Sequence, residues 1–511
     1  TPPARTAVSM TSSPDPRPSR ASESIEVAAL RQIHQWPLVQ RDLSKKPNLG
    51  AWTRRPDPLD AISEGEDGKQ WSFQEFVYFH DFVQRFLYDD HENGAFQLYS
   101  RSDIAGLIVG IEDALHEFSV ERLTLHRFVT GAAVVTLETV WKGRKAANGP
   151  TSDTPSLNLA EAQTIIDHMR RSYTPYWGRR DDGTLEGGRV PTSFAILGAD
   201  GSEQSFRVDQ NPDDLFDVVR RNRYDDAVVF EHWRRIAGLS LQGGDREPEW
   251  RDPSDERIPL LSYIALRQRP DESPRDTMLM VRDHDWIRLA DAEEAGDAHP
   301  YNPRFLEDVE RRAFYDRFFP HEAMPSYLAT RHVFGGAHYC VVGVSDPEAK
   351  FDFARDLLRR QFRRHYAQMA LIARFEHASL LSYSSRMTEA VRRRQIAGGD
   401  PSAERDFEDE IAAIRDEFLS FTHRFRFTGV SSQIQGAEMF DRWRDMLRLD
   451  TLYADVETEL RSSMEHVRAQ QEARRADDAL RLAGIAEFIA VFGIAVAALS
   501  MPAVTDAIER L

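Results

Sequence analysis

The chain has 511 residues and a formal net charge of −18, with 83 acidic and 65 basic side chains. Nucleic-acid affinity rests mainly on cations that neutralise phosphates, so this charge argues against general nucleic-acid binding, and we expect no nucleic-acid partner. A content of 41% hydrophobic residues is typical of globular proteins, and the length leaves room for roughly two to four domains. The single cysteine, Cys340, excludes an intramolecular disulfide framework.

The first two thirds of the chain predict a disordered tail and a mixed domain. Residues 1–22 are rich in proline and serine, and we expect them to be disordered. Residues 23–345 alternate between sheet and helix signals, which predicts an α/β (α+β) cytoplasmic domain. Short strands are expected at 192–198 and 258–267, because both runs are apolar and bounded by turn residues. The order of the strands does not follow from the sequence.

Several local signals fix individual elements of this domain. The pattern favours a short helix at 23–35 and a β-hairpin at 123–141 with Thr130-Gly131 at its turn. A disordered loop is expected at 142–156. Asn158 followed three residues later by Glu161 is a capping box, which predicts that a helix begins there. The aromatic residues after Trp71 form a stripe that predicts a core-facing segment: Phe73, Phe76, Phe79, Phe82 and Phe86.

Beyond residue 345 the pattern becomes helical. A helix is predicted from the cap at Asp346-Pro347 to Gln395, where the run GGDP stops it. Apolar residues then recur at spacings of four and three, which is typical of a helix packed along a long partner: Phe407, Ile411, Ile414, Phe418, Phe421 and Phe425. We therefore expect 346–481 to form a long antiparallel helical hairpin and a stalk. The stalk helix begins after Gly429 or Gly436 and meets no proline before Pro502.

An apolar run near the C-terminus predicts a transmembrane helix at 482–504, followed by a short tail at 505–511. About 23 residues suffice to cross the hydrocarbon core of a bilayer, and a buried helix of a soluble domain is the alternative. Four arginines precede the run and one follows it, which places the N-terminal domain in the cytoplasm, at the inner (cytoplasmic) membrane: Arg468, Arg474, Arg475 and Arg481 before it, Arg510 after it.

This succession of elements resembles the CorA-type magnesium transporter superfamily. The local sequence most similar to that family begins FTHRFRFTGVSSQIQGAEMFDRWRDMLRLD and continues into the span, and the likeness covers 346–504 by pattern. The resemblance implies a homopentamer whose first span lines a pore, with a Gly-Met-Asn motif at the outer end that binds the hydrated ion. Here that position reads Ser500-Met501-Pro502, so the motif is absent. A second span after Leu511 would favour a pore, and a genuine stop would favour an anchor.

Two sets of candidate site residues follow. Glu487, Gly493, Ser500 and Met501 are the pore-lining or membrane-facing candidates. A carboxylate inside a span usually faces a pore, water or a partner, so Glu487 would form an acidic ring in a pentamer, and snorkelling at the interface is the alternative. The candidate ligands for Mg²⁺ or another divalent cation are Asp291, Glu293, Glu294 and Asp297. Solvent-exposed acid is the alternative for this cluster, because it lacks the spacing of an EF-hand loop.

Other candidate residues have a structural interpretation beside the functional one. His332 and His338 flank Gly335-Gly336 and would be either metal ligands across a hairpin or satisfied structural histidines. The five arginines Arg355, Arg359, Arg360, Arg363 and Arg364 predict a solvated helix face paired with acids, with an anionic ligand as the alternative.

No common nucleotide, zinc or serine-hydrolase motif is present, so the sequence predicts neither an enzyme nor a certain cofactor. Two functions lead: a CorA-like membrane protein that conducts or regulates the passage of a divalent cation, or a tail-anchored oligomeric scaffold or signalling effector. A soluble enzyme with an apolar terminal helix is the third interpretation. Both leading functions involve the lipid bilayer and a homo-oligomer.

Overall fold

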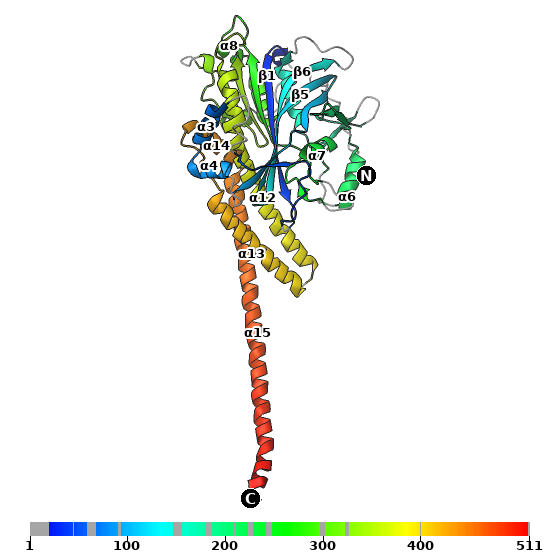
Figure 1. Cartoon of the computed structure of the whole chain (residues 1–511), viewed down its shortest axis with the longest axis vertical. Helices are drawn as coiled ribbons and strands as arrows, with labels where there is room; N and C mark the ends of the chain where they lie inside the picture. The colour runs from blue at the N-terminus through cyan, green and yellow to red at the C-terminus, as the bar shows by residue number, and fades with distance from the viewer. Residues whose placement is uncertain are drawn as a thin grey trace, which may run out of the picture. The chain divides into compact units, whose positions relative to one another are not determined.

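The structure is a computed structural model of the chain, and Figure 1 shows its ribbon. It describes residues 20–43, 45–58, 68–89, 94–146, 156–179, 185–208, 210–222, 228–241, 248–296, 302–321, 326–398 and 400–508. The chain divides into two compact units, of which the first comprises Thr1–Ser382 and Phe421–Leu452 and the second Tyr383–Ser420 and Tyr453–Leu511. All nine tryptophans of the sequence fall within the ranges of the first unit.

A mixed sheet of 14 described strands forms the first unit's centre. Along its main path the strands are β11 (Glu203–Phe206), β10 (Ser193–Gly198), β4 (Ile104–Ile111), β5 (Ala114–Phe128), β6 (Ala132–Ala146), β1 (Glu26–Gln40), β13 (Leu260–Arg267), β16 (His338–Ser345), β15 (Thr330–Phe334) and β14 (Phe314–Tyr315). Four more strands pair beside this path: β2 (Thr53–Arg55), β3 (Phe96–Ser100), β7 (Leu157–Asn158) and β12 (Trp250–Arg251). Among the described pairs of this sheet, β13 with β16 is parallel and the others are antiparallel. The unit therefore confirms a mixed α and β domain.

Strand β1 corrects the predicted helix at 23–35. It pairs with β6 on one side and β13 on the other, so it lies inside the sheet. Every residue from Leu30 to Gln40 is buried, because both faces of the strand are covered. Such a strand lacks the polar and apolar alternation that would reveal it in the sequence. The predicted disordered tail at 1–22 ends in a short helix, α1 (Arg20–Glu23). Residues 1–19 lie outside the described part of the chain.

Two local predictions are confirmed. Strands β5 and β6 form the hairpin around Thr130-Gly131, and Gly131 has a φ of 79°, which a residue with a side chain rarely adopts. Helix α5 (Leu159–Met169) begins at the capping box, where Asn158 Oδ1 accepts from the Glu161 amide at 2.8 Å. The predicted loop at 142–156 is wrong at its start, since β6 continues to Ala146; residues 147–155 lie outside the described part.

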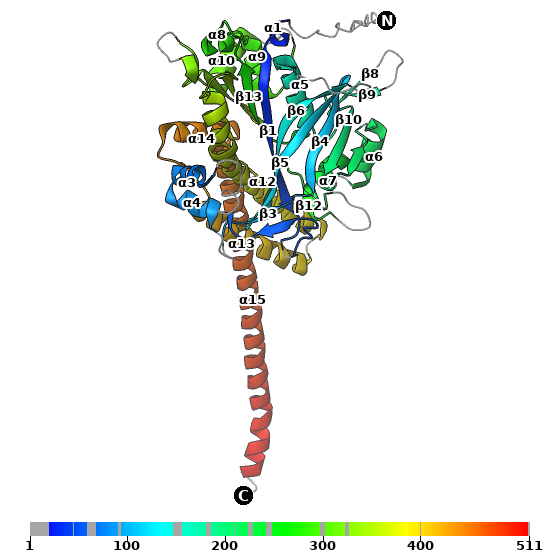
Figure 2. The same ribbon diagram turned by 45° about the horizontal axis from the view of Figure 1, so that its top comes forward.

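The remaining helices of the first unit cover the sheet and its edges. They are α3 (Gly68–Tyr78), α4 (Asp81–Tyr88), α6 (Pro212–Asn222), α7 (Glu231–Ala237), α8 (Pro274–Leu279), α9 (Asp283–Asp291), α10 (Pro303–Ala313) and the short η1 (Ser326–Leu328). In Figures 1 and 2, α3, α4 and α14 (Ile434–Met446) lie together, away from α6 and α7. A separate two-stranded sheet pairs β8 (Trp177–Arg179) with β9 (Leu185–Gly187).

The apolar core contains side chains from nearly every strand, and Cys340 on β16 is fully buried within it. The aromatic stripe after Trp71 is only partly a core stripe. Phe79 and Phe86 are buried, whereas Phe73 is 65% and Phe82 is 47% exposed. The prediction of a continuous core-facing stripe is therefore wrong for these two side chains, because the segment is split between α3 and α4.

The helical half begins later than predicted. Residues 346–352 are not helical, and a continuous run starts at η2 (Phe353–Leu358), where Asp352 Oδ1 accepts from the Arg355 amide at 2.9 Å. The run passes through α11 (Arg359–Gln361) and η3 (Phe362–Tyr366) into α12 (Ala367–Ile396). Thus Asp352, and not Asp346, provides the N-cap. Helix α13 (Pro401–Arg424) follows the predicted stop.

The predicted single stalk helix is two helices. Helix α14 ends at Met446 and α15 (Leu449–Ile508) begins three residues later, with Arg448 between them at a φ of 52°. A left-handed residue cannot continue a right-handed helix, so the chain changes direction at this point. Neither glycine nor proline marks the break, which is why the sequence pattern did not reveal it.

In the second unit, α13 folds back along the end of α12, as the heptad seam predicts. Arg386 binds Glu410 at 3.0 Å and also pairs with Glu417, and Arg394 Nε lies 2.7 Å from Glu404. The seam residues Phe407, Ile411, Ile414 and Phe418 are buried. Helix α15 has 60 residues, and every residue from 472 to 497 is exposed.

Candidate functional site

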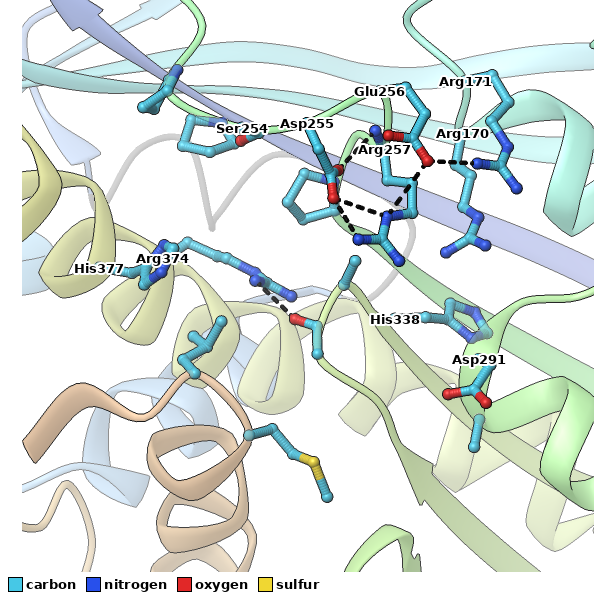
Figure 3. Close-up of a pocket in the computed structure, with 18 of the residues that line it drawn as sticks. Arg170, Arg171, Ser254, Asp255, Glu256, Arg257, Asp291, His338, Arg374 and His377 are labelled. Atoms are coloured by element: carbon cyan, nitrogen blue, oxygen red, sulfur yellow. Dashed lines mark hydrogen bonds and ion pairs between the residues drawn. The ribbon is translucent and has the colours of Figure 1, made fainter. Parts of the chain in front are cut away.

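A cavity of about 760 Å³ lies within the first unit. Its walls come from the loop before β13, the end of α9, the turn between β15 and β16, the first part of α12, and the break between α14 and α15. Six arginines and four carboxylates line it among the described residues: Arg170, Arg171, Arg189, Arg257, Arg374 and Arg448, with Asp255, Glu256, Asp291 and Glu293. Figure 3 shows ten of the lining residues with labels. The volume is in the range of small-molecule sites.

Arg374 is the unusual member of this set. Its side chain comes from α12 and is only 5% exposed, and its Nη1 donates to the Gly336 carbonyl at 3.1 Å. Burial lowers the pKa of Arg374 to about 10. No carboxylate among the described residues forms an ion pair with it, and its Nε has no hydrogen-bond partner there. Burying a cation without a counter-ion costs desolvation free energy. The burial of this guanidinium therefore needs a physical reason.

The other buried arginines share a few carboxylates. Asp167, fully buried at the end of α5, lies 2.7 Å from Arg171, 3.5 Å from Arg170 and 3.6 Å from Arg189. Arg171 also binds Glu256 at 2.9 Å, and Arg257 pairs with Asp255. Burial, together with the charges of Arg171 and Arg257, lowers the pKa of Arg170 to about 10 despite the opposing charge of Asp167. Six arginines thus line the cavity against four carboxylates in the lining itself, and Asp167 behind the lining is a partner shared by three of these arginines.

The cavity histidine His338 is a structural residue. Its ring nitrogens lie 2.7 Å from the Leu289 carbonyl and 2.9 Å from Ser262 Oγ. Burial, with smaller contributions from Arg170 and Arg374, lowers the pKa of His338 to about 3. It is therefore neutral at physiological pH.

If His332 and His338 were metal ligands, they would face each other across the hairpin. They do not. In the hairpin it lies opposite Val341, and its Nδ1 lies 2.8 Å from the Tyr339 hydroxyl. The interpretation as a satisfied structural histidine fits His338, whereas His332 Nε2 is buried without a hydrogen-bond partner among the described residues. His377, on the cavity wall, also has a lowered pKa of about 4, through burial and the charge of Arg374.

The predicted metal-binding carboxylates divide between the cavity and nearby ion pairs. Asp291 and Glu293 line the cavity, and burial with the charge of Glu293 raises the pKa of Asp291. Glu294 lies 3.5 Å from Arg189, while Asp297 lies outside the described residues. No group of three histidine, cysteine, aspartate or glutamate side chains in the described ranges is arranged to hold a metal ion.

The arginines after Asp352 do not form a simple solvated face. Arg364 binds the buried Glu75 at 2.9 Å, and Arg363 pairs with the fully buried Glu138. Arg355 matches the prediction of a surface pair, with Asp356 at 3.1 Å. Sequence reasoning missed Glu75 and Glu138, because nothing local distinguishes a carboxylate whose arginine partner is more than two hundred residues away.

The apolar C-terminal helix is the second candidate site. Among the described residues, α15 is the one helix that is long and apolar enough to cross a membrane, judged by length and composition. Glu487 and Gly493 lie in its exposed part, and Ser500 and Met501 belong to its last turns. From residue 480 to residue 496 its large apolar side chains are half to three-quarters exposed, among them Phe488, Ile489, Phe492 and Ile494. A single helix of this kind suggests membrane anchoring.

Comparisons with protein-family models, with curated proteins and with solved structures find no match to this chain. The apolar helix and the arginine-lined cavity are therefore the features that bear on function.

Proposed function

We propose that this chain is a membrane protein anchored by α15, with its first unit in the cytoplasm at the inner membrane. The observation that carries the proposal is the exposure of the apolar part of α15, because burying such side chains in hydrocarbon is favourable and leaving them in water is not. Every backbone group inside a helix is hydrogen-bonded within it, as a bilayer core requires. The arginines at 468–481 are the basis for the cytoplasmic orientation.

The proposal includes self-association through α15 and the hairpin of α12 and α13. Small residues recur along the apolar part of α15, among them Gly484, Gly493, Ala495 and Ala497, and such residues allow membrane helices to approach closely. The resemblance to the CorA-type superfamily makes a homopentamer the expected assembly. In that assembly the copies of α15 would surround one axis.

Charging the apolar run tests the anchor. The double variant Phe492→Arg with Ile494→Arg places two cations at the middle of the span, which costs about 2.5 to 3.5 kcal/mol for each residue on insertion scales. We expect the wild-type chain to resist alkaline carbonate extraction and the variant to be released. Leu480→Arg, an equally exposed position before the run, is the matched control and should stay in the membrane. Wild-type protein found wholly in the soluble fraction would overturn the proposal.

A cation pathway is the more specific form of this proposal. Glu487 is the one acidic or basic residue within the run at 482–504, so an assembly around α15 would repeat its side chain around the axis, where carboxylates attract cations. We expect the Glu487→Gln variant to lower Mg²⁺ flux into proteoliposomes severalfold. Glu472→Gln, on the same helix but before the run, should leave the flux unchanged. If the wild-type chain integrates into the membrane but passes no Mg²⁺, the scaffold or signalling alternative is favoured.

A further inference from the structure

We infer that the arginine-lined cavity of the first unit binds a phosphorylated small molecule, a phosphate ester of about the size of a mononucleotide. The inference is independent of the membrane proposal, because every residue that lines the cavity belongs to the first unit. The chain as a whole has a net charge of −18. The lining of this cavity, in contrast, contains more arginines than carboxylates.

Three guanidinium groups define the anion-binding end. Figure 3 draws Arg170, Arg257 and Arg374 from three different segments with their side chains directed at one space. Arg257 lowers the pKa of Arg170, and Arg170 and Arg374 both lower that of His338, so His338 is a neighbour that Arg170 and Arg374 share. Several arginines around one space match the geometry of a phosphate, which accepts paired hydrogen bonds from more than one guanidinium.

Arg374 is the residue that points to a ligand. Its partner in the described structure is a single backbone carbonyl, although the side chain is 95% buried and remains a cation at neutral pH. Arg170, Arg171 and Arg257 each have a carboxylate partner, so the missing counter-ion distinguishes Arg374 from these three arginines. An anion in the cavity would provide that counter-ion and an acceptor for the unbonded Nε.

The rest of the wall indicates what else the ligand carries. The carboxylates Asp291 and Glu256 can accept hydrogen bonds from hydroxyl groups. Leu381, Met446 and Leu447 provide an apolar portion of the lining. A volume of about 760 Å³ exceeds what inorganic phosphate alone would fill. A phosphate joined to a hydroxylated body fits both parts of this wall.

Calorimetric titration of the detergent-solubilised full chain tests the inference with inorganic phosphate, ribose 5-phosphate and AMP. Ribose and adenosine are the matched neutral probes. We expect saturable binding of the two esters, weaker binding of inorganic phosphate, and no binding of the neutral compounds. Esters that bind no more tightly than inorganic phosphate would overturn the assignment of an ester. Failure of all three phosphates to bind at millimolar concentrations would overturn the site.

The variant Arg374→Met separates binding from folding. Because it removes a buried charge without a counter-ion, we expect the unliganded variant to unfold at the same or a higher temperature. We expect its affinity for AMP to fall by about tenfold to a hundredfold, the range for a hydrogen-bonded charged group. Arg374→Lys keeps the cation and should retain part of the affinity. Arg392→Gln, on the same helix outside the cavity lining, should bind as the wild type does.

Two results would contradict the three-arginine site. Unchanged affinity in Arg374→Met, with the fold intact by tryptophan fluorescence, would show that the ligand does not contact this guanidinium. If the variant does not fold, Arg257→Gln is measured instead, since its side chain is partly exposed and its loss should be tolerated. Unchanged AMP affinity in that variant would also overturn the three-arginine site.

Discussion

The Glu138→Gln variant is expected to lose about 3 to 5 kcal/mol of unfolding free energy, the cost of removing one partner from a buried ion pair. Glu138 lies on β6 and is fully buried, with Arg31 from β1 at 3.5 Å and Arg122 from β5 at 3.3 Å. Arg363 from η3 also pairs with it. One carboxylate thus joins two neighbouring strands and a helix, and its loss removes the counter-ion that three cations share.

The loss of unfolding free energy in Glu138→Gln should become smaller as the pH falls. Burial alone would raise the pKa of Glu138, but the charges of Arg122, Arg363 and Arg31 hold it below its ordinary value. A carboxylate with a lowered pKa contributes stability that is present above its unfolded pKa and lost as the pH falls through its folded pKa. The wild type should therefore lose stability on acidification, and the difference between wild type and Glu138→Gln should shrink.

Urea unfolding followed by tryptophan fluorescence measures this effect, because all nine tryptophans report on the first unit. Glu26→Gln is the control, since Glu26 pairs with Arg267 at 3.1 Å and both side chains are about half exposed. Exposed pairs of this kind contribute about 0 to 1 kcal/mol. Equal destabilisation of the two variants would contradict the role assigned to Glu138.

The Glu376→Gln variant is expected to stabilise the first unit at neutral pH. Glu376 on α12 is 2% exposed, its Oε1 accepts from the Phe427 amide at 3.1 Å, and the guanidinium of Arg444 lies 3.8 Å away. Arg444 also pairs with Asp450. Burial therefore dominates and raises the pKa of Glu376 to about 8. A neutral glutamine would keep the hydrogen bond to Phe427 and avoid the ionisation.

The sign of the pH effect is opposite to that for Glu138. An unfolded glutamate ionises near its ordinary pKa and a folded Glu376 near 8, so stability falls as the pH rises through that window. The advantage of Glu376→Gln should grow by about 2 to 3 kcal/mol between roughly pH 5 and pH 7. Urea unfolding of both proteins at the two pH values measures this growth. An advantage that is the same at both would show that Glu376 titrates normally.

The sequence predicted those features that depend on neighbouring residues. The capping box at Asn158 and Glu161 and the glycine turn at Gly131 each need only a few adjacent positions, and both are confirmed. The heptad seam of α13 is regular enough to predict an antiparallel partner. In contrast, β1 is recognisable as a strand only once β6 and β13 are known to cover both of its edges.

The cavity could not be predicted because its residues are brought together by the order of the strands. Arg170 follows α5, Arg257 precedes β13 and Arg374 lies on α12, so no spacing in the sequence relates them. The break at Arg448 has no sequence signal either, since arginine is an ordinary helix residue that adopts a left-handed conformation here. Long-range strand pairing assembles the cavity, and a local pattern carries no information about it.

The burial of Cys340 has a practical consequence for the C-terminal helix. Burial raises the pKa of this thiol, so it stays protonated and inaccessible in the folded chain. The 511-residue chain should therefore be nearly unreactive toward thiol-specific labels, and Cys340 need not be replaced first. A single cysteine placed in turn along 472–497 would be the only reactive group, and its labelling pattern would mark where lipid begins and on which side the chain enters it.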